Sequence, residues 1–356
     1  MNTATATAKN RQPQFVEVLY QRINAYFKDN NISKKGNSMM TGKIIASLIC
    51  WTGSYAAMFI FKLSYAQFFF IMMFNGFAQV FILLNITHDA NHNAISKRLW
   101  VNKALSYLMD VNGINSYMWK ILHHTGHHNC TNIQLEDEAV IAKGTLRLTP
   151  YTPYRKIYKF QHLYFLLLYA VTSIDWIFLK DFGFFFFSKY EHTAKVKHPV
   201  KEIIILFAGK LFYVTYMLIL PMIFLPFSIG QIFLAFVAMH ALIGVYTTFV
   251  FQTTHVIESS TFPDSKKEYE HYVYHIFATT ADYSVHKPLT NWFSGGLNQH
   301  IIHHLVPNIC HTHYTELTEI VKETANEYGV PYRENPSMYR ALVEHVTLLR
   351  RLGRRK

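Results

Sequence analysis

Four long apolar stretches restrict the fold of this chain more than any other feature of its sequence. They cover residues 44–63, 67–86, 203–227 and 229–251. A helix needs about 20 mostly apolar residues to cross the hydrocarbon core of a membrane. Short segments around 64–66 and 226–230 join the stretches in pairs, so we expect two transmembrane hairpins. Charged residues make up only 16% of the chain, against about a quarter in soluble domains.

The basic residues predict how these hairpins are oriented. Lys62 is the only basic residue close to either hairpin turn. The basic residues that precede the hairpins are Arg11, Arg22, Lys28, Lys34, Lys35, Lys43, Lys195, Lys197 and Lys201. Because cytoplasmic loops carry an excess of Lys and Arg, both termini and the middle segment are predicted to be cytoplasmic. Lys210, inside the third stretch, is expected to extend toward that face.

Residues 160–187 are a further apolar segment, interrupted by Asp175, Lys180 and Asp181. A charge at the bilayer centre is costly. We therefore expect this segment to lie at the interface or partly sunk in it, and not to form a fifth crossing.

Nine of the 20 histidines fall into three tight clusters beside the apolar stretches. The clusters occupy residues 88–92, 123–128 and 300–304, and His255 follows the fourth stretch directly. His88 and His92 are four residues apart, so both rings lie on one face of a helix. Imidazole suits zinc, copper, iron and nickel. So many imidazoles exceed the needs of one ion and predict a site for two metals.

Acidic residues near the clusters are candidates to orient the ligating rings, since a ligating imidazole donates its other N–H to such a partner. They are Asp89, Glu136, Asp137, Glu138 and Glu258. Taken singly, each is as readily explained as a solvated surface charge. Cys130 and Cys310 lie beside the clusters and are better explained as small buried side chains than as ligands.

The predicted fold is an all-α integral membrane protein. It has four transmembrane helices in two hairpins and a cytosolic helical cap that carries the di-metal site. Residues 1–42 form an amphipathic cytosolic segment, 43–256 the transmembrane and interfacial helices, and 257–356 a C-terminal region with helices near 314–328 and 336–352. The net charge of +12 predicts contact with anionic lipid headgroups and an acidic protein partner, and not with nucleic acid.

The clusters and their surroundings resemble the membrane fatty acid desaturase family, over about residues 84–353. The match is closest to the acyl-CoA and front-end members known as linoleoyl-CoA desaturases. It is carried by His88-Asp89-Ala90-Asn91-His92, Trp119-Lys120 through His128 to Thr131-Asn132, Phe160-Gln161-His162-Leu163-Tyr164, Phe251-Gln252 with His255-Val256, and Gly295-Gly296-Leu297-Asn298 leading to His303-His304-Leu305 and Pro307.

The resemblance implies a set of metal ligands. They are His88, His92, His123, His127, His128, His255, His300, His303 and His304. His124 is the alternate to His123, which we prefer because its spacing of four places it over His127. His300 departs from the front-end pattern, where glutamine is usual. Gln252 and Asn298, in the matching motifs, join the candidate partners of the ligands.

The resemblance also implies an O2-dependent reaction that uses two iron ions and places a cis double bond in a fatty acyl lipid or acyl-CoA. No catalytic side chain is expected beyond the metal ligands. The sequence has no His-Pro-Gly-Gly haem motif and no nucleotide-binding glycine fingerprint. A separate ferredoxin or cytochrome b5-like protein is therefore expected to deliver electrons.

Two other functions fit the histidines alone. A hydroxylase or ketolase acting on a lipid or alkane would use the same di-iron scaffold. A membrane metal transporter would place ligands along a path through the bilayer, but here the clusters lie outside the apolar stretches.

Overall fold

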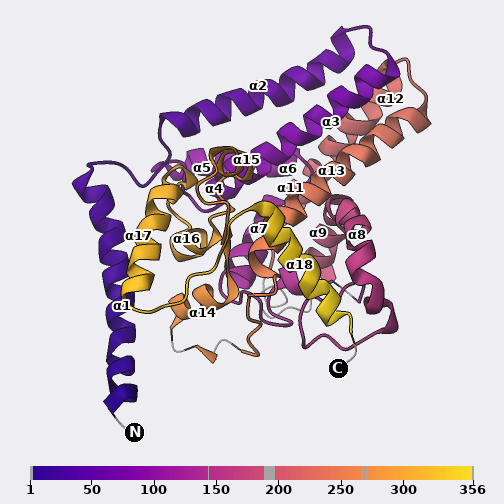
Figure 1. Cartoon of the computed structure of the whole chain (residues 1–356). Helices are drawn as coiled ribbons and strands as arrows, with labels where there is room; N and C mark the ends of the chain where they lie inside the picture. The colour runs from indigo at the N-terminus through magenta and orange to yellow at the C-terminus, as the bar shows by residue number, and fades with distance from the viewer. Residues whose placement is uncertain (1–2, 143, 188–196, 266–267, 270, 355–356) are drawn as a thin grey trace.

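The computed structural model describes residues 3–142, 144–187, 197–265, 268–269 and 271–354, with only the backbone of residues 3–12 (Figure 1). Lys195, one of the residues used to predict orientation, lies outside these ranges. The described chain is almost entirely helical. Two short strands, β1 (Asp282–Tyr283) and β2 (Glu334–Asn335), pair in parallel with Asp282 opposite Glu334.

Within the described residues, five helical segments are long and apolar enough to cross a membrane. They are Ser38–Ile60, Tyr65–Asn91, Lys156–Phe187, Val200–Phe224 and Ile229–His255. The first, second, fourth and fifth contain most of the four predicted stretches. The remaining one contains the segment expected at the interface, which by length and composition qualifies as a span.

The first hairpin consists of α2 (Ser38–Ile60) and α3 (Tyr65–Ile82). In the second, α11 (Val200–Val214), η6 (Thr215–Ile219) and α12 (Leu220–Phe224) together form one arm and α13 (Ile229–His255) forms the other. The second helix of each hairpin begins with a capping box. Ser64 and Ser228 each cap a helix whose third residue is a glutamine. The side-chain oxygen of Gln67 or Gln231 accepts the backbone N–H of the capping serine. This reciprocal arrangement satisfies amide groups that a helix start would otherwise leave unpaired.

The segment 156–187 changes direction within the structure. It consists of η4 (Lys156–Phe160), α8 (Gln161–Asp175), the π-helical turn η5 (Trp176–Lys180) and α9 (Asp181–Phe187). Ser173 Oγ lies 3.0 Å from His240 Nδ1, midway along α13. The Phe185 ring lies 4.3 Å from that of His198, just before α11 (Val200–Val214). The segment therefore lies beside the middle of α13 at Ser173 and has turned back to the start of α11 by Phe185.

Lys210 does not extend toward an exposed face, so that expectation is wrong. Its side chain is buried in α11, where the ammonium group contacts the Asp181 carboxylate and the Gly113 carbonyl. Two charges that each interrupt an apolar stretch thus neutralise one another, which lowers the cost of burying them. After α11 the chain continues through η6 (Thr215–Ile219) and α12 (Leu220–Phe224).

Short elements between the hairpins surround the end of α3. They are η1 (Leu83–Thr87), α4 (His88–Asn91), α5 (Leu99–Ser106), α6 (Leu108–Val111), α7 (Ser116–Lys120), η2 (Ile121–His127) and η3 (Glu138–Val140). After α13 follow α14 (Tyr272–Thr279), α15 (Pro288–Ser294), α16 (His300–Leu305), η8 (His311–His313), α17 (Tyr314–Glu327) and α18 (Met338–Leu352).

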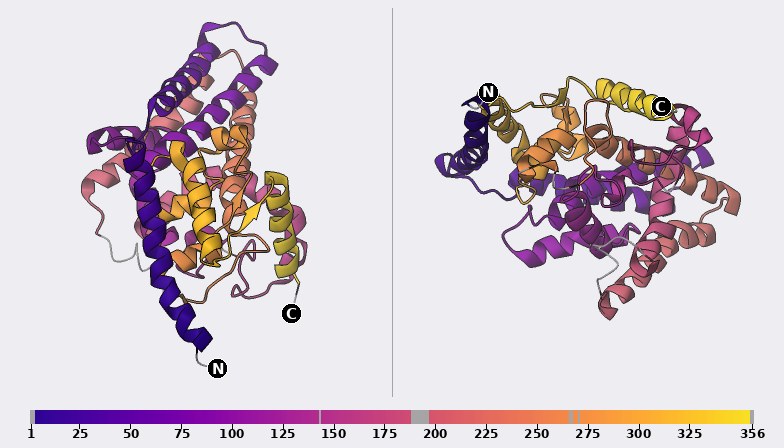
Figure 2. Two further views of the ribbon diagram at one scale, coloured as in Figure 1. Left: turned by 60° about the vertical axis from the view of Figure 1, so that its left-hand side comes forward. Right: turned by 90° about the horizontal axis from the view of Figure 1, so that it is seen from below.

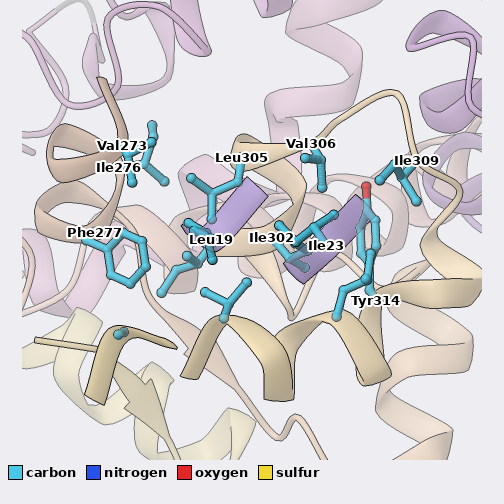
Figure 3. Packing of buried hydrophobic residues seen from close by; sticks show 14 of the residues in the cluster. Leu19, Ile23, Val273, Ile276, Phe277, Ile302, Leu305, Val306, Ile309 and Tyr314 are labelled. Atoms are coloured by element: carbon cyan, nitrogen blue, oxygen red, sulfur yellow. The ribbon is translucent and has the colours of Figure 1, made fainter. Parts of the chain in front are cut away.

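Helices α1 (Thr3–Asp29) and α17 pack against α16, which carries the third histidine cluster. Helix α1 runs beside α17 in both side views (Figures 1 and 2). Leu19 and Ile23 of α1 are fully buried in one cluster with Ile302 of α16 and Tyr314 of α17 (Figure 3). On the other side, α18 packs on α8 and α13, where His345 Nε2 lies 2.8 Å from the Tyr169 hydroxyl.

Candidate metal centre

Histidines from all three clusters converge on one buried place, together with His255. Two groups form there, and within each group the ring nitrogens lie within 4.8 Å of one another. The first group is His88, His92, His123 and His303, and the second is His127, His255, His300 and His304. His128 lies between them, with Nε2 3.1 Å from Nε2 of both His123 and His303. Its ring is also 4.3 Å from that of His304.

A π-helical turn positions the second cluster. The His128 N–H donates to the His123 carbonyl at 2.9 Å, five residues back, where an α-helix would bond four back. The wider turn stacks the His123 ring on His127, with centroids 5.4 Å apart, and leaves His128 between the two groups. Single π turns inside helices are frequent at functional sites. A second π turn, η1, directly precedes His88.

His124 does not join either group. Its ring stacks on His92 with centroids 4.3 Å apart, and its side chain is half-buried. The His123 ring, by contrast, is buried within the first group. The geometry thus favours His123 of the two alternatives left by the sequence.

The third cluster is set by a glycine pair and a buried carboxylate. Gly295 and Gly296 have φ of 66° and 71°, and a Cβ on Gly295 would lie 2.5 Å from the Leu84 carbonyl oxygen. Only glycine fits such a turn against neighbouring backbone. Asp282 then accepts the Ile301 N–H at 2.9 Å, which fixes the start of α16.

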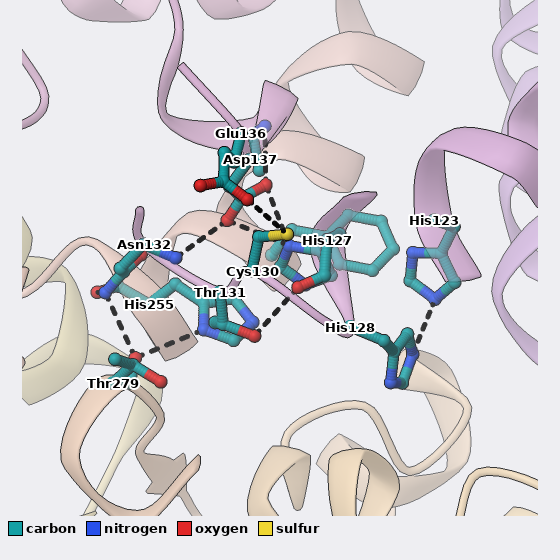
Figure 4. Close-up of polar contacts among 12 residues, drawn as sticks. His123, His127, His128, Cys130, Thr131, Asn132, Glu136, Asp137, His255 and Thr279 are labelled. Atoms are coloured by element: carbon teal, nitrogen blue, oxygen red, sulfur yellow. Dashed lines mark hydrogen bonds and ion pairs between the residues drawn. The ribbon is translucent and has the colours of Figure 1, made fainter. Parts of the chain in front are cut away.

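Several rings have one nitrogen held by an acceptor, which leaves the other for a metal. His127 Nδ1 lies 3.1 Å from Asp137 Oδ1 (Figure 4). The other contacts are His255 Nδ1 to the Thr279 carbonyl at 3.3 Å, His300 Nδ1 to the Leu297 carbonyl at 2.9 Å and His303 Nδ1 to the Tyr314 hydroxyl at 3.3 Å. Such contacts select the tautomer and orient the ring.

The remaining nitrogens fit metal ligation. Among the described residues, Nε2 of His88, His92 and His300 and Nδ1 of His304 are buried without a hydrogen-bond partner. Burial, followed by neighbouring imidazoles, lowers the pKa of His123, His128 and His303 well below the usual value. Neutral imidazole is the form that binds metals, so this donor set suits two metal ions.

His127 differs electrostatically from the other rings. Burial lowers its pKa, but the charge and hydrogen bond of Asp137 outweigh burial, so the pKa is raised. A carboxylate on the far nitrogen makes an imidazole a stronger metal ligand.

The other predicted partners have different contacts. Glu136 lies 3.2 Å from the Cys130 thiol and Glu138 contributes negative charge near His127. Gln252 donates to the Ala139 carbonyl, Glu258 pairs with Arg351, and Asn298 donates to the Tyr283 carbonyl. Asp89 accepts from the His311 ring at 2.8 Å and lies 3.9 Å from His88 Nδ1. Asp137 thus contacts a candidate ligand, His127, directly.

A second polar cluster, missed in the sequence, borders the first group. Asp89, Cys310 and His311 are buried together, and Lys43 Nζ lies 2.9 Å from His311 Nε2. Lys43 therefore brings a positive charge to this cluster through His311, and Asp89 binds the other nitrogen of the same ring, so we interpret the cluster as a hydrogen-bonded support for the first group. Tyr314 was also missed, since nothing near it in sequence marks it as a partner of His303.

An apolar cavity adjoins the centre on its membrane side. A small cavity of about 20 Å³ lies between α3, η1, α6, α8 and α13, and Thr87, which precedes His88, lines it. Leu83, Met109, Ile177 and Ile243 form other parts of its wall. A cavity of this volume holds about one water molecule, so its walls would have to move apart to admit an acyl chain.

Comparisons with known proteins agree with this arrangement. The model of the family described as fatty acid desaturase matches residues 63–336. An acyl-lipid (8-3)-desaturase from Physcomitrium patens is 32% identical over 352 residues, covering 98% of this chain and 73% of its own. The sn-1 linoleoyl-lipid 6-desaturase of Synechocystis sp. is 31% identical over 364 residues, 99% of each chain. That of Arthrospira platensis is 30% identical over 343 residues, 95% of this chain and 92% of its own. The chain therefore belongs to the fatty acid desaturase family, a family of membrane oxidoreductases.

Proposed function

We propose that this protein introduces a cis double bond into the acyl chain of a lipid or acyl-CoA, using O2, two iron ions and an external electron donor. The observation that carries this proposal is the pair of histidine groups, with His128 between them, beside the apolar cavity. The names of the relatives add that related chains act on acyl lipids.

The residues have distinct parts in this reaction. The nine imidazoles would hold the two irons, which supply the oxidising power for removing hydrogen from an unactivated methylene pair. Overall, O2, two electrons and two protons convert –CH2–CH2– to –CH=CH– and two water molecules. Asp137 and Tyr314 hold His127 and His303 in orientation. The cavity wall would exclude water and, once opened by the entering chain, would place one C–C bond near His88, which follows Thr87 of the wall.

We further propose four crossings, with both termini cytoplasmic. The contacts of Ser173 with His240 and of Phe185 with His198 support a segment 156–187 that enters and leaves on one side. The convergence of His88, at the end of α3, and His255, at the end of α13, supports placing both helix ends on that side. We propose the same division of the chain as above. Residues 43–256 form the transmembrane and interfacial helices, while residues 1–42 and 257–356 pack together in the cytosolic cap.

The test is expression of the chain in a host that lacks the product fatty acids, followed by fatty-acid analysis with double-bond localisation. The expected result is a product two hydrogens lighter, absent with His303→Ala and retained with the exposed-residue control His286→Ala. A product that has gained oxygen would instead identify a hydroxylase or ketolase. Purified protein should contain close to two irons per chain, and a centre filled with another metal would contradict the proposal.

A further inference from the structure

A basic pocket lies at the corner where α1 ends and α2 begins, at the upper left of Figure 1. It has a volume of about 490 Å³ and is wide open to solvent. Its lining is Asn24, Phe27, Lys28, Ile32, Ser33, Lys34, Lys35 and Lys97. These lining residues, all within the described part of the chain, include four lysines and no acidic side chain.

Two of the lysines are fixed in place by the fold. Lys34 Nζ donates to Asn24 Oδ1 at 2.6 Å. Lys35 Nζ donates to the carbonyls of Asn93 at 2.9 Å and Asn308 at 3.1 Å. Burial and then the charge of Lys34 lower the pKa of Lys35, as expected where positive charges gather without an anion. Lys28 and Lys97 are exposed at the rim.

The surroundings place this pocket at the level of lipid headgroups. The first candidate span begins at Ser38, three residues after Lys35. Ile32 and Met39 on one side and Leu99 and Trp100 beside Lys97 are exposed apolar side chains. Tryptophan and lysine together are typical of the interface between membrane and water.

One helical stretch connects this pocket, the metal centre and the apolar cavity in order. Gln79, Leu83 and Thr87 line the cavity, and His88 and His92 belong to the first histidine group. Asn93, the next residue, accepts from Lys35 of the pocket. At 1.5 Å per helical residue, about 12 Å separates Gln79 from Thr87, whereas Asn93 lies just past the end of α4 with a positive φ of 56°. The acyl chain of a lipid held at the pocket would therefore reach the metals before it reaches the cavity.

Building on the function proposed above, we infer that this pocket binds the phosphate of an anionic phospholipid whose acyl chain is the substrate. Lysine ammonium groups are common phosphate ligands. An acidic electron-donor protein is the other anion to consider, but protein interfaces are broad and close-packed. A concave site lined by four lysines fits a small anion better.

The test compares lipid binding by the full-length protein in detergent with native mass spectrometry. The variant Lys28→Gln/Lys97→Gln removes two rim charges and leaves the contacts of Lys34 and Lys35 intact. Lys156→Gln/Lys159→Gln is the matched control, since it removes two exposed charges from η4, away from the pocket. The probes are phosphatidylglycerol, an uncharged galactosyl diacylglycerol and inorganic phosphate.

Binding of phosphatidylglycerol is expected to weaken about tenfold in the pocket variant and to stay unchanged in the control. Galactolipid should bind both variants like wild type, and free phosphate should compete only at far higher concentration. Lys34→Gln should show the same loss. Equal losses in pocket variant and control, or no loss in either, would overturn the inference. So would unchanged lipid binding combined with slower reduction by an acidic ferredoxin, which would mark a protein-docking surface.

These outcomes are separable from the proposed function. Because the readout is lipid binding, a chain that binds phosphatidylglycerol through these lysines but forms no double bond would refute the desaturase proposal alone. A chain that desaturates lipids but binds them independently of the lysines would refute only the pocket.

Discussion

His127 Nδ1 lies 3.1 Å from Asp137 Oδ1, and this buried pair joins the second histidine cluster to the loop that follows it. The same carboxylate accepts the Asn132 and Ala139 N–H groups at 2.9 Å. One side chain therefore fixes both the loop and the orientation of a candidate ligand, which makes it a sensitive place to test the metal centre.

Asp137→Asn should weaken iron binding by about 10–100-fold, because partners of ligating histidines typically contribute that much to metal affinity. The fall is measured as iron per chain after dialysis against graded chelator. Glu258→Gln, at an exposed ion pair with Arg351, is the control. Iron retention equal to that of the control would contradict the role given to Asp137.

Alanine variants of the neighbouring residues His123 and His124 should differ sharply in turnover and in bound iron. His123→Ala removes a ring from the first group and should abolish turnover and cut bound iron, whereas His124→Ala loses only a ring that stacks on His92. Turnover and iron content of the two variants decide the assignment. If His124→Ala lost as much iron as His123→Ala, the preference for His123 would be wrong.

Gly295→Ala should destabilise the fold, with a lower iron content, because a Cβ there meets the Leu84 carbonyl oxygen at 2.5 Å. Gly329→Ala is a matched control, since Gly329 also has a positive φ of 68° but no neighbour within 4 Å. Backbone strain alone costs about 1–3 kcal/mol. The melting temperature should therefore fall further for Gly295→Ala, and equal falls would contradict the contact.

Stability should depend on pH through Asp282. Burial raises the pKa of this carboxyl to about 7, from about 3.9 in an unfolded chain. Its contribution is fully present below pH 4 and is lost as pH rises through 7, by up to about 4 kcal/mol. Asp282→Asn keeps an acceptor for Ile301 and should flatten the melting temperature between pH 5 and pH 8. An unchanged pH profile in the variant would refute this assignment.

The apolar cavity should limit the length of the acyl chain. Ile243→Phe adds volume to its wall and should lower turnover of long chains more than of short ones. Ile223→Phe, at an exposed position, is the control. Competition between substrates of two chain lengths measures the ratio, and a ratio equal to wild type would show that the chain lies elsewhere.

The sequence predicted the features that rest on local pattern. Apolar length indicated the spans, and spacing indicated the three histidine clusters. The position of His255 just past the fourth stretch, together with the family resemblance, indicated that this residue joins them. It did not predict contacts between distant segments, such as Tyr314 with His303 or Asp282 with Ile301. The expectation for Lys210 failed for the same reason, because its partner Asp181 is 29 residues away. The π turn at His123–His128 was also missed, since an α-helical period was assumed.

The packing of α1 and α17 around α16 has a consequence for how the enzyme matures. Each histidine group draws members from the first 130 residues of the chain and from residues 300–304, and α16 is braced by the chain's first helix and by α17. A nascent chain still emerging from the ribosome has no complete ligand set. On the function proposed above, metal loading would therefore follow synthesis, and a stop codon before α17 would yield a protein unable to retain the metal ions.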